Sequence, residues 1–203
     1  MNQVLSLPVK APASYHLDLH RYWLSKRGPR RMPARSDIDP TEISRLLPYL
    51  CIVEKLAGEF RYRLVGTAIA QQFGRDFTGK TLGSPINDKP ETVKAMRTIV
   101  EHIFATGNSV FVTGQYETKF KTIHNVSALG LPLSGDGTHV DMFISTRIAR
   151  FSWGVRSASD WLRGAPLSTQ WTDIDDAIDL ERCCLNWERL CDPPASAFGQ
   201  RNT

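Results

Sequence analysis

The most concentrated charge in the chain is a basic cluster near its N-terminus. Within ten positions the sequence carries five basic residues: Lys26, Arg27, Arg30, Arg31 and Arg35. Such a cluster could bind phosphates or an acidic partner, or it could be a solvated turn beside a helix. Prolines at positions 29 and 33 interrupt any long basic helix, and no aromatic residues are interleaved as in single-strand binders. We therefore rank nucleic-acid or acidic-partner binding below a structural role for this cluster.

A second group with potential chemistry is the set of cysteines near the C-terminus, Cys183, Cys184 and Cys191. Cys184 and Cys191 are seven positions apart, which places them on one face of a helix. Zinc needs about four ligands, whereas this part of the chain contains no histidine and its cysteine spacing matches no zinc motif. We expect no metal site here. A redox or interface role for one of these thiols stays open.

Sequence motifs of common catalytic sites are missing from the chain. There is no Gly-x-Ser-x-Gly elbow, no Gly-rich phosphate loop, no His-Glu-x-x-His and no kinase catalytic loop. Asp39 and Glu42 could suggest acid chemistry. Their spacing around Pro40 is that of a helix N-terminus, with Asp39 as the cap, and we favour this structural role because it explains both residues without chemistry. We expect a protein that is not an enzyme.

Composition sets the broad class. The 203 residues are 41% hydrophobic and 23% charged, the balance of a globular protein of one domain with extensions or two small ones. The net charge of +4 is mild for a nucleic-acid binder. No apolar run approaches the roughly 18 residues of a membrane span, and residues 4–7 are too short for a signal peptide core. Because four cysteines do not make a disulfide framework, we expect a cytoplasmic protein with reduced thiols.

Hydrophobic periodicity predicts the elements that position these residues. Residues 1–13 read as a flexible tail, and a stripe at Tyr15, Leu19, Tyr22 and Trp23 predicts a helix over 14–27. A short helix is expected from Pro40 to residue 47. Strands follow at 49–54 and 60–65, then a short helix at 67–73 and a long one from about 91 to 106.

Three further strands are predicted at 109–118, 125–133 and 139–148, with an Asp-Gly hairpin between the last two. In the last strand we expect Val140, Met142, Ile144, Thr146 and Ile148 to point inward. Asp141, Ser145 and Arg147 would point outward, with Phe143 as the exception on that face. The order of elements gives an α+β fold with a five-stranded antiparallel sheet.

Residues 151–203 read as a C-terminal extension with one amphipathic helix, running from Thr172 or Asp173 to about Cys191. This helix could pack back on the sheet, pair with a second copy or dock a partner. We expect a homodimer or a partner complex formed through the apolar stripes of the two terminal helices: Tyr15, Leu19, Trp23, Leu180 and Trp187.

Three segments carry a resemblance: LSKRGPRRMPARSDIDP at 24–40, FRYRLVGTAIAQQFGRDFTGKTL at 60–82 and LGLPLSGDGTHVDM at 129–142. With their PAR-DIDP, RLxGT…FGRDxTG and LPLxxDG motifs, they resemble a family of small bacterial proteins built around one PAS-like domain, over residues 14–150. The resemblance implies a cupped five-stranded sheet with helices packed on one face. It also implies a pocket between sheet and helices, although the same side chains could fill a dry core. The candidate walls are Tyr62, Leu64, Ile69, Phe73, Met96, Val100, Phe104 and Val112.

The resemblance also implies two cofactors to consider, haem and flavin. PAS domains that bind haem often use a histidine on the long helix. Here His102 lies opposite Val100 and Phe104 on the predicted helix, so we expect it to face solvent. Light-sensing flavin chemistry needs a cysteine motif, and no cysteine lies between Cys51 and Cys183. We therefore expect no cofactor.

The resemblance implies a non-enzymatic sensory or protein-interaction module of bacterial signalling. The alternative is a small-molecule binding protein with a hydrophobic ligand. A further alternative is binding of nucleic acid or an acidic partner through Lys26–Arg35.

Overall fold

The computed structural model describes residues 13–84, 90–117, 123–151, 170–174 and 177–191. A single antiparallel sheet organises them, with the strand order β2-β1-β5-β4-β3-β6. The expected α+β fold is confirmed, and the sheet has six strands where five were predicted. Their bounds are β1 Leu50–Leu56, β2 Glu59–Val65, β3 Ser109–Glu117, β4 Ile123–Leu133, β5 Met142–Phe151 and β6 Gln170–Ile174.

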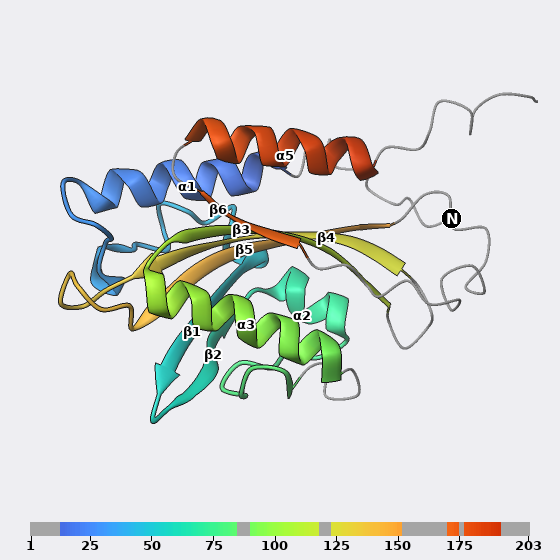
Figure 1. The fold of residues 1–203 in the computed structure, drawn as a ribbon, viewed down its shortest axis with the longest axis horizontal. Coiled ribbons are helices and arrows are strands. Elements are labelled where there is room, and N and C mark those ends of the chain that lie inside the picture. Colours follow the sequence, from blue (N-terminus) through green and yellow to red (C-terminus); the bar gives the residue numbers. More distant parts are fainter. Residues whose placement is uncertain (1–12, 85–89, 118–122, 152–169, 175–176, 192–203) are drawn as a thin grey trace, which may run out of the picture.

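Helices cover both faces of this sheet. α1 (Ala13–Arg27) and α5 (Ala177–Cys191) lie on one face, and α2 (Thr67–Phe73) and α3 (Pro90–Thr106) lie on the other (Figure 1). Short 3-10 turns at Arg35–Asp37 and Leu47–Tyr49 connect α1 to β1. Among the described residues, no helix has the length and apolar character needed to cross a bilayer.

Strand β1 shows how the sheet separates two hydrophobic cores. Leu50 and Ile52 belong to the core under α1 and α5, whereas Cys51 and Val53 belong to the core under α2 and α3. Alternate residues of a strand point to opposite faces, so a strand covered on both faces can be apolar at successive positions. This is why Phe143 breaks the predicted alternation of β5: it packs against α3, while Ile144 packs on the other face.

Strand β6 was predicted as the start of the C-terminal helix. Instead, Gln170–Ile174 pairs antiparallel with β3, in a register that places Ser109 opposite Ile174, and α5 begins at Ala177. The unpaired edge of β3 offers hydrogen bonds that a local helix signal cannot anticipate.

The short helix expected after Asp39 is also absent from the described structure. Asp39 Oδ1 instead accepts hydrogen bonds from the backbone N and Oγ1 of Thr41, each at 2.8 Å, and holds a turn.

The apolar stripes of the terminal helices are used inside the molecule. Leu19, Trp23 and Leu180 are 0%, 4% and 0% exposed, and they belong to the core beneath α1 and α5. These three side chains, predicted to form a partner surface, pack inside this chain instead, because an amphipathic pattern does not distinguish the chain's own sheet from a second molecule. Tyr15 is half-buried and stacks on Tyr49. The side chain of Trp187 lies outside the described residues.

A buried polar contact fixes α1 to the sheet. His16 is fully buried, with Nδ1 2.7 Å from Thr146 Oγ1 and Nε2 2.8 Å from Ser127 Oγ. Both ring nitrogens thus have hydroxyl partners, one on β5 and one on β4. Burial lowers the pKa of His16 to about 3, so the imidazole is neutral in the folded protein.

We predict that this histidine makes the protein sensitive to mild acid. Below its ordinary pKa of about 6.5, an unfolded His16 binds a proton that the folded state refuses, so stability falls as the pH drops from there toward 3. The slope from this group is roughly 1 kcal/mol per pH unit. His16→Gln keeps hydrogen-bonding atoms but does not titrate. The variant should therefore show a smaller pH dependence of the free energy of unfolding, measured with urea between about pH 6.5 and 5. An unchanged slope in the variant would contradict this assignment.

Close backbone packing at the start of α2 requires a glycine. Gly66 donates its N–H to Leu50 O at 2.7 Å, and a Cβ at this position would overlap the carbonyl oxygens of Leu47 and Pro48. Gly74 ends the same helix with φ of +69° and has open space around its Cβ position.

These two glycines make a matched pair for mutation. Gly66→Ala should lower the free energy of unfolding by about 3 kcal/mol or more, because backbone atoms cannot move aside cheaply. Gly74→Ala carries only the strain of a left-handed alanine, about 1–2 kcal/mol. Chemical denaturation of both variants measures the difference. Equal losses would show that the contact with Leu47 and Pro48 does not constrain Gly66.

Candidate functional site

A cavity of about 200 Å³ lies between the sheet and the helices α2 and α3. Its walls are almost entirely apolar. The helices and the segment after α2 contribute Ile69, Phe73, Phe77, Leu82, Thr92, Met96, Ile99, Val100 and Ile103. The sheet contributes Cys51, Val53, Tyr62, Val112, Gly114, Val126, Ala128, Gly130, Phe143, Ser145 and Arg147.

Small residues on β3 and β4 create this space. Gly114 pairs with Val126, and Ala128 pairs with Val112, so two adjacent rows of the sheet present little side-chain volume to α3. At Gly130 the helix approaches closely, since a Cβ there would lie 2.9 Å from Ile103 Cδ1. Helix α3 therefore touches the sheet at Gly130. A hollow remains beside Gly114 and Ala128.

Six of the eight predicted wall residues line the cavity: Tyr62, Ile69, Phe73, Met96, Val100 and Val112. Leu64 does not, although it has the same parity as Tyr62. The pairing of β1 with β2 shifts register between Ile52 and Val53, whose partners are Leu64 and Tyr62. The resulting bulge at Arg63 turns Leu64 toward the opposite core. Phe104 lies outside the cavity wall and packs on Phe60 and Phe143, with ring centroids 5.0 and 6.1 Å away.

The polar residues of the cavity were missed because the outward face of β5 was misassigned. Ser145 and Arg147 have the parity of Phe143, and all three face α2 and α3 rather than solvent. The large apolar Phe143 on a supposedly exposed face was the available signal. Ser145 Oγ donates a hydrogen bond to Cys51 O at 3.3 Å, which ties β5 to β1 beside the cavity.

Arg147 is held at the α2 side of the cavity. Its Nη1 donates a hydrogen bond to Gln72 Oε1, and its guanidinium carbon lies 4.8 Å from the centroid of the Phe73 ring. Burial raises the pKa of the Cys51 thiol to about 12, and burial also raises the pKa of the Tyr62 phenol. Both groups are therefore neutral near pH 7, beside a guanidinium that stays charged.

The prediction that His102 faces solvent is wrong. Its Nε2 lies 2.8 Å from Asp173 Oδ1, its ring packs 4.4 Å from Trp171, and its side chain is 24% exposed. Strand β6 supplies both partners, which is why helix periodicity alone gave the wrong environment. His102 is not among the residues that line the cavity.

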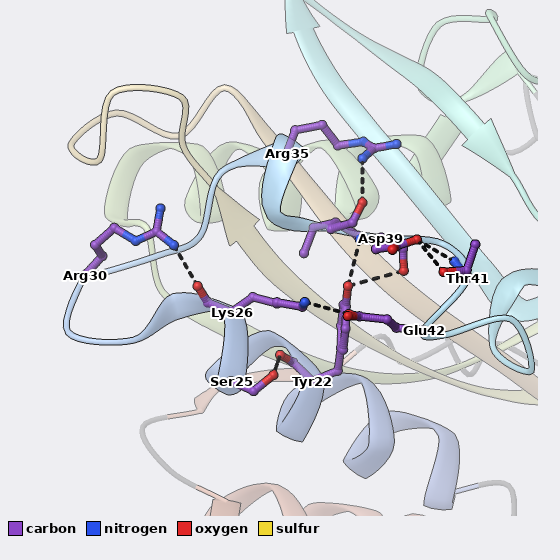
Figure 2. A network of polar contacts seen from close by, with 9 residues as sticks. Tyr22, Ser25, Lys26, Arg30, Arg35, Asp39, Thr41 and Glu42 are labelled. Atoms are coloured by element: carbon purple, nitrogen blue, oxygen red, sulfur yellow. Dashed lines mark hydrogen bonds and ion pairs between the residues drawn. The ribbon is translucent and has the colours of Figure 1, made fainter.

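The basic cluster is engaged in contacts within the chain (Figure 2). Lys26 Nζ lies 2.6 Å from Glu42 Oε2, and Arg30 Nη2 lies 2.7 Å from Asp37 Oδ2. The remaining three also have internal contacts: Arg27 lies over the Trp23 ring, Arg31 donates to Thr106 O and Arg35 donates to Ile38 O. Most of these contacts brace α1 and the segment that follows it, and that of Arg31 ties the segment to α3, which favours the structural role over phosphate binding.

The cysteines of α5 form no metal site in the part of the chain that the structure describes, where no three metal-ligating side chains come together. Cys184 is buried and Cys183 is half-buried, and burial raises the pKa of the Cys183 thiol. The side chain of Cys191 lies outside the described residues.

Comparison with known proteins bears on this architecture. A family model described as a PAS domain matches residues 11–147, about two thirds of the chain. No curated protein matches.

Solved structures similar to this chain include the PAS domain of Bordetella pertussis BvgS. It is 16% identical with a TM-score of 0.43, over 75% of this chain and 98% of that one. The Rhodobacter sphaeroides LOV protein is 12% identical with a TM-score of 0.39, over 60% and 72% of the two chains. VqmA in the Vibrio cholera VqmA–ligand–DNA complex is 15% identical with a TM-score of 0.43, over 62% of this chain and 57% of that one.

Proposed function

This chain belongs to the PAS domain family, whose members are sensory and signalling modules, and from that premise we propose that it senses a small molecule with an apolar body. The proposed site is the cavity between α3 and the sheet. The observation that carries the proposal is a hollow of about 200 Å³ in the middle of an otherwise close-packed core. Small residues at Gly114 and Ala128 keep this space open.

The size and lining of the cavity indicate the size and polarity of the ligand. An apolar cavity of about 150 Å³ is large enough to hold benzene. The space here suits one aromatic ring or a short branched chain. Apolar walls favour such a ligand through the area it removes from water.

Strand β5 offers a route from the cavity to the opposite face of the sheet. Ser145 and Arg147 line the cavity, while Thr146 between them contacts His16 of α1. A ligand that shifts β5 would thus change the support of α1, and of α5 packed beside it. We propose that this face presents the response to a signalling partner or to a second copy, without catalysis and in the cytoplasm.

Filling the cavity should abolish ligand binding. Met96→Trp places an indole ring in the cavity. The affinity for fluorobenzene, measured by fluorine NMR, should then fall at least about tenfold. The matched control is Lys94→Trp, two residues earlier on α3, where the side chain is exposed.

Binding that survives Met96→Trp would contradict the proposed site. If the wild-type protein binds no small aromatic probe, or if both tryptophan variants lose binding equally, the cavity is not a specific binding site.

A further inference from the structure

One charged side chain is among the residues that line this largely apolar space. Among the described residues that line the cavity, Arg147 is the only charged one; the others are apolar residues, glycines or neutral polar groups. Its cross-strand neighbour on β4 is Ala128, whose small side chain leaves room beside the guanidinium. Ser145, two positions earlier on β5, presents a hydroxyl on the same face.

Side chains from α2 orient this guanidinium. The hydrogen bond to Gln72 Oε1 and the stacking on Phe73 come from adjacent residues of that helix. A guanidinium carries five N–H donors in a planar fork. Its charge also acts within the cavity, because it partly opposes the rise that burial produces in the pKa of both Cys51 and Tyr62.

An oriented cation in an apolar cavity, whose other lining residues are neutral, selects for charge. The attraction between opposite charges is several times stronger in such surroundings than in water, and a planar carboxylate can accept two parallel hydrogen bonds from one guanidinium. A cationic ligand would be repelled, and a purely apolar ligand would gain nothing from the charge.

We propose that the ligand is a small organic anion, with an apolar body about the size of one aromatic ring and a carboxylate that pairs with Arg147. This inference rests on the proposed ligand-sensing function. It adds the chemical class of the molecule sensed and assigns Arg147 as the residue that determines specificity.

A matched pair of probes tests this class. The probes para-fluorobenzoate and para-fluorobenzamide have nearly the same shape but differ in charge, and fluorine NMR measures the affinity of each. The wild-type protein should bind the benzoate about 10- to 100-fold more tightly than the amide. Arg147→Gln should remove this preference and still bind the amide, which also shows that the variant is folded.

Two further variants separate the alternatives. Arg147→Lys keeps the charge without the planar fork, so a reduced preference for the benzoate should remain. Arg150→Gln removes the same charge from a position of opposite parity on β5 and should keep the full preference.

Failure of either proposal gives a different result. Equal wild-type affinity for benzoate and amide would overturn the anion assignment while leaving the cavity as a site, and so would a preference that persists in Arg147→Gln. Should Arg147→Gln fail to fold, equal binding of both probes by Arg147→Lys would overturn the assignment. Binding of neither probe by the wild-type protein would overturn the ligand-sensing function itself.

Discussion

Burial of both faces of one antiparallel sheet is the constraint on which this structure depends. Helices α1 and α5 close one face and α2 and α3 close the other, so every strand in the middle of the sheet must supply apolar side chains at successive positions. Strand β5 illustrates the consequence, with Phe143 in one core and Ile144 in the other. Polar groups that share these faces must then have partners, as His16 has in Thr146 and Ser127.

The same constraint gives β5 its place in the proposed function. It lies between β1 and β4, in the interior of the sheet, and its alternate residues reach both cores. A molecule that contacts Arg147 is therefore one residue away along the chain from the hydrogen bond that holds α1. Close packing leaves few ways for β5 to move without changing both sides.

Three aspartates of the sequence motifs hold turns of the scaffold. Asp39 and Asp76 each accept hydrogen bonds from the backbone and hydroxyl of the threonine two positions later. Asp136 binds the backbone N–H groups of Thr138 and His139 in the hairpin between β4 and β5. Short aspartate side chains stabilise turns in this way, so these three residues support the fold and carry no information about a ligand.

Local pattern was enough to predict α1, α3 and the Asp-Gly hairpin, because periodicity reports which residues are buried, and the family resemblance added six residues of the cavity wall. It could not report what they are buried against. The pairing of β6 with β3, the bulge that turns Leu64 away and the inward position of Arg147 all depend on chain segments distant in sequence. The burial of Leu19 and Leu180 does too, since an apolar stripe fits its own sheet or a partner equally well. Only the tertiary structure decides between such surfaces, because hydrogen bonding across an edge and packing across a face are non-local interactions.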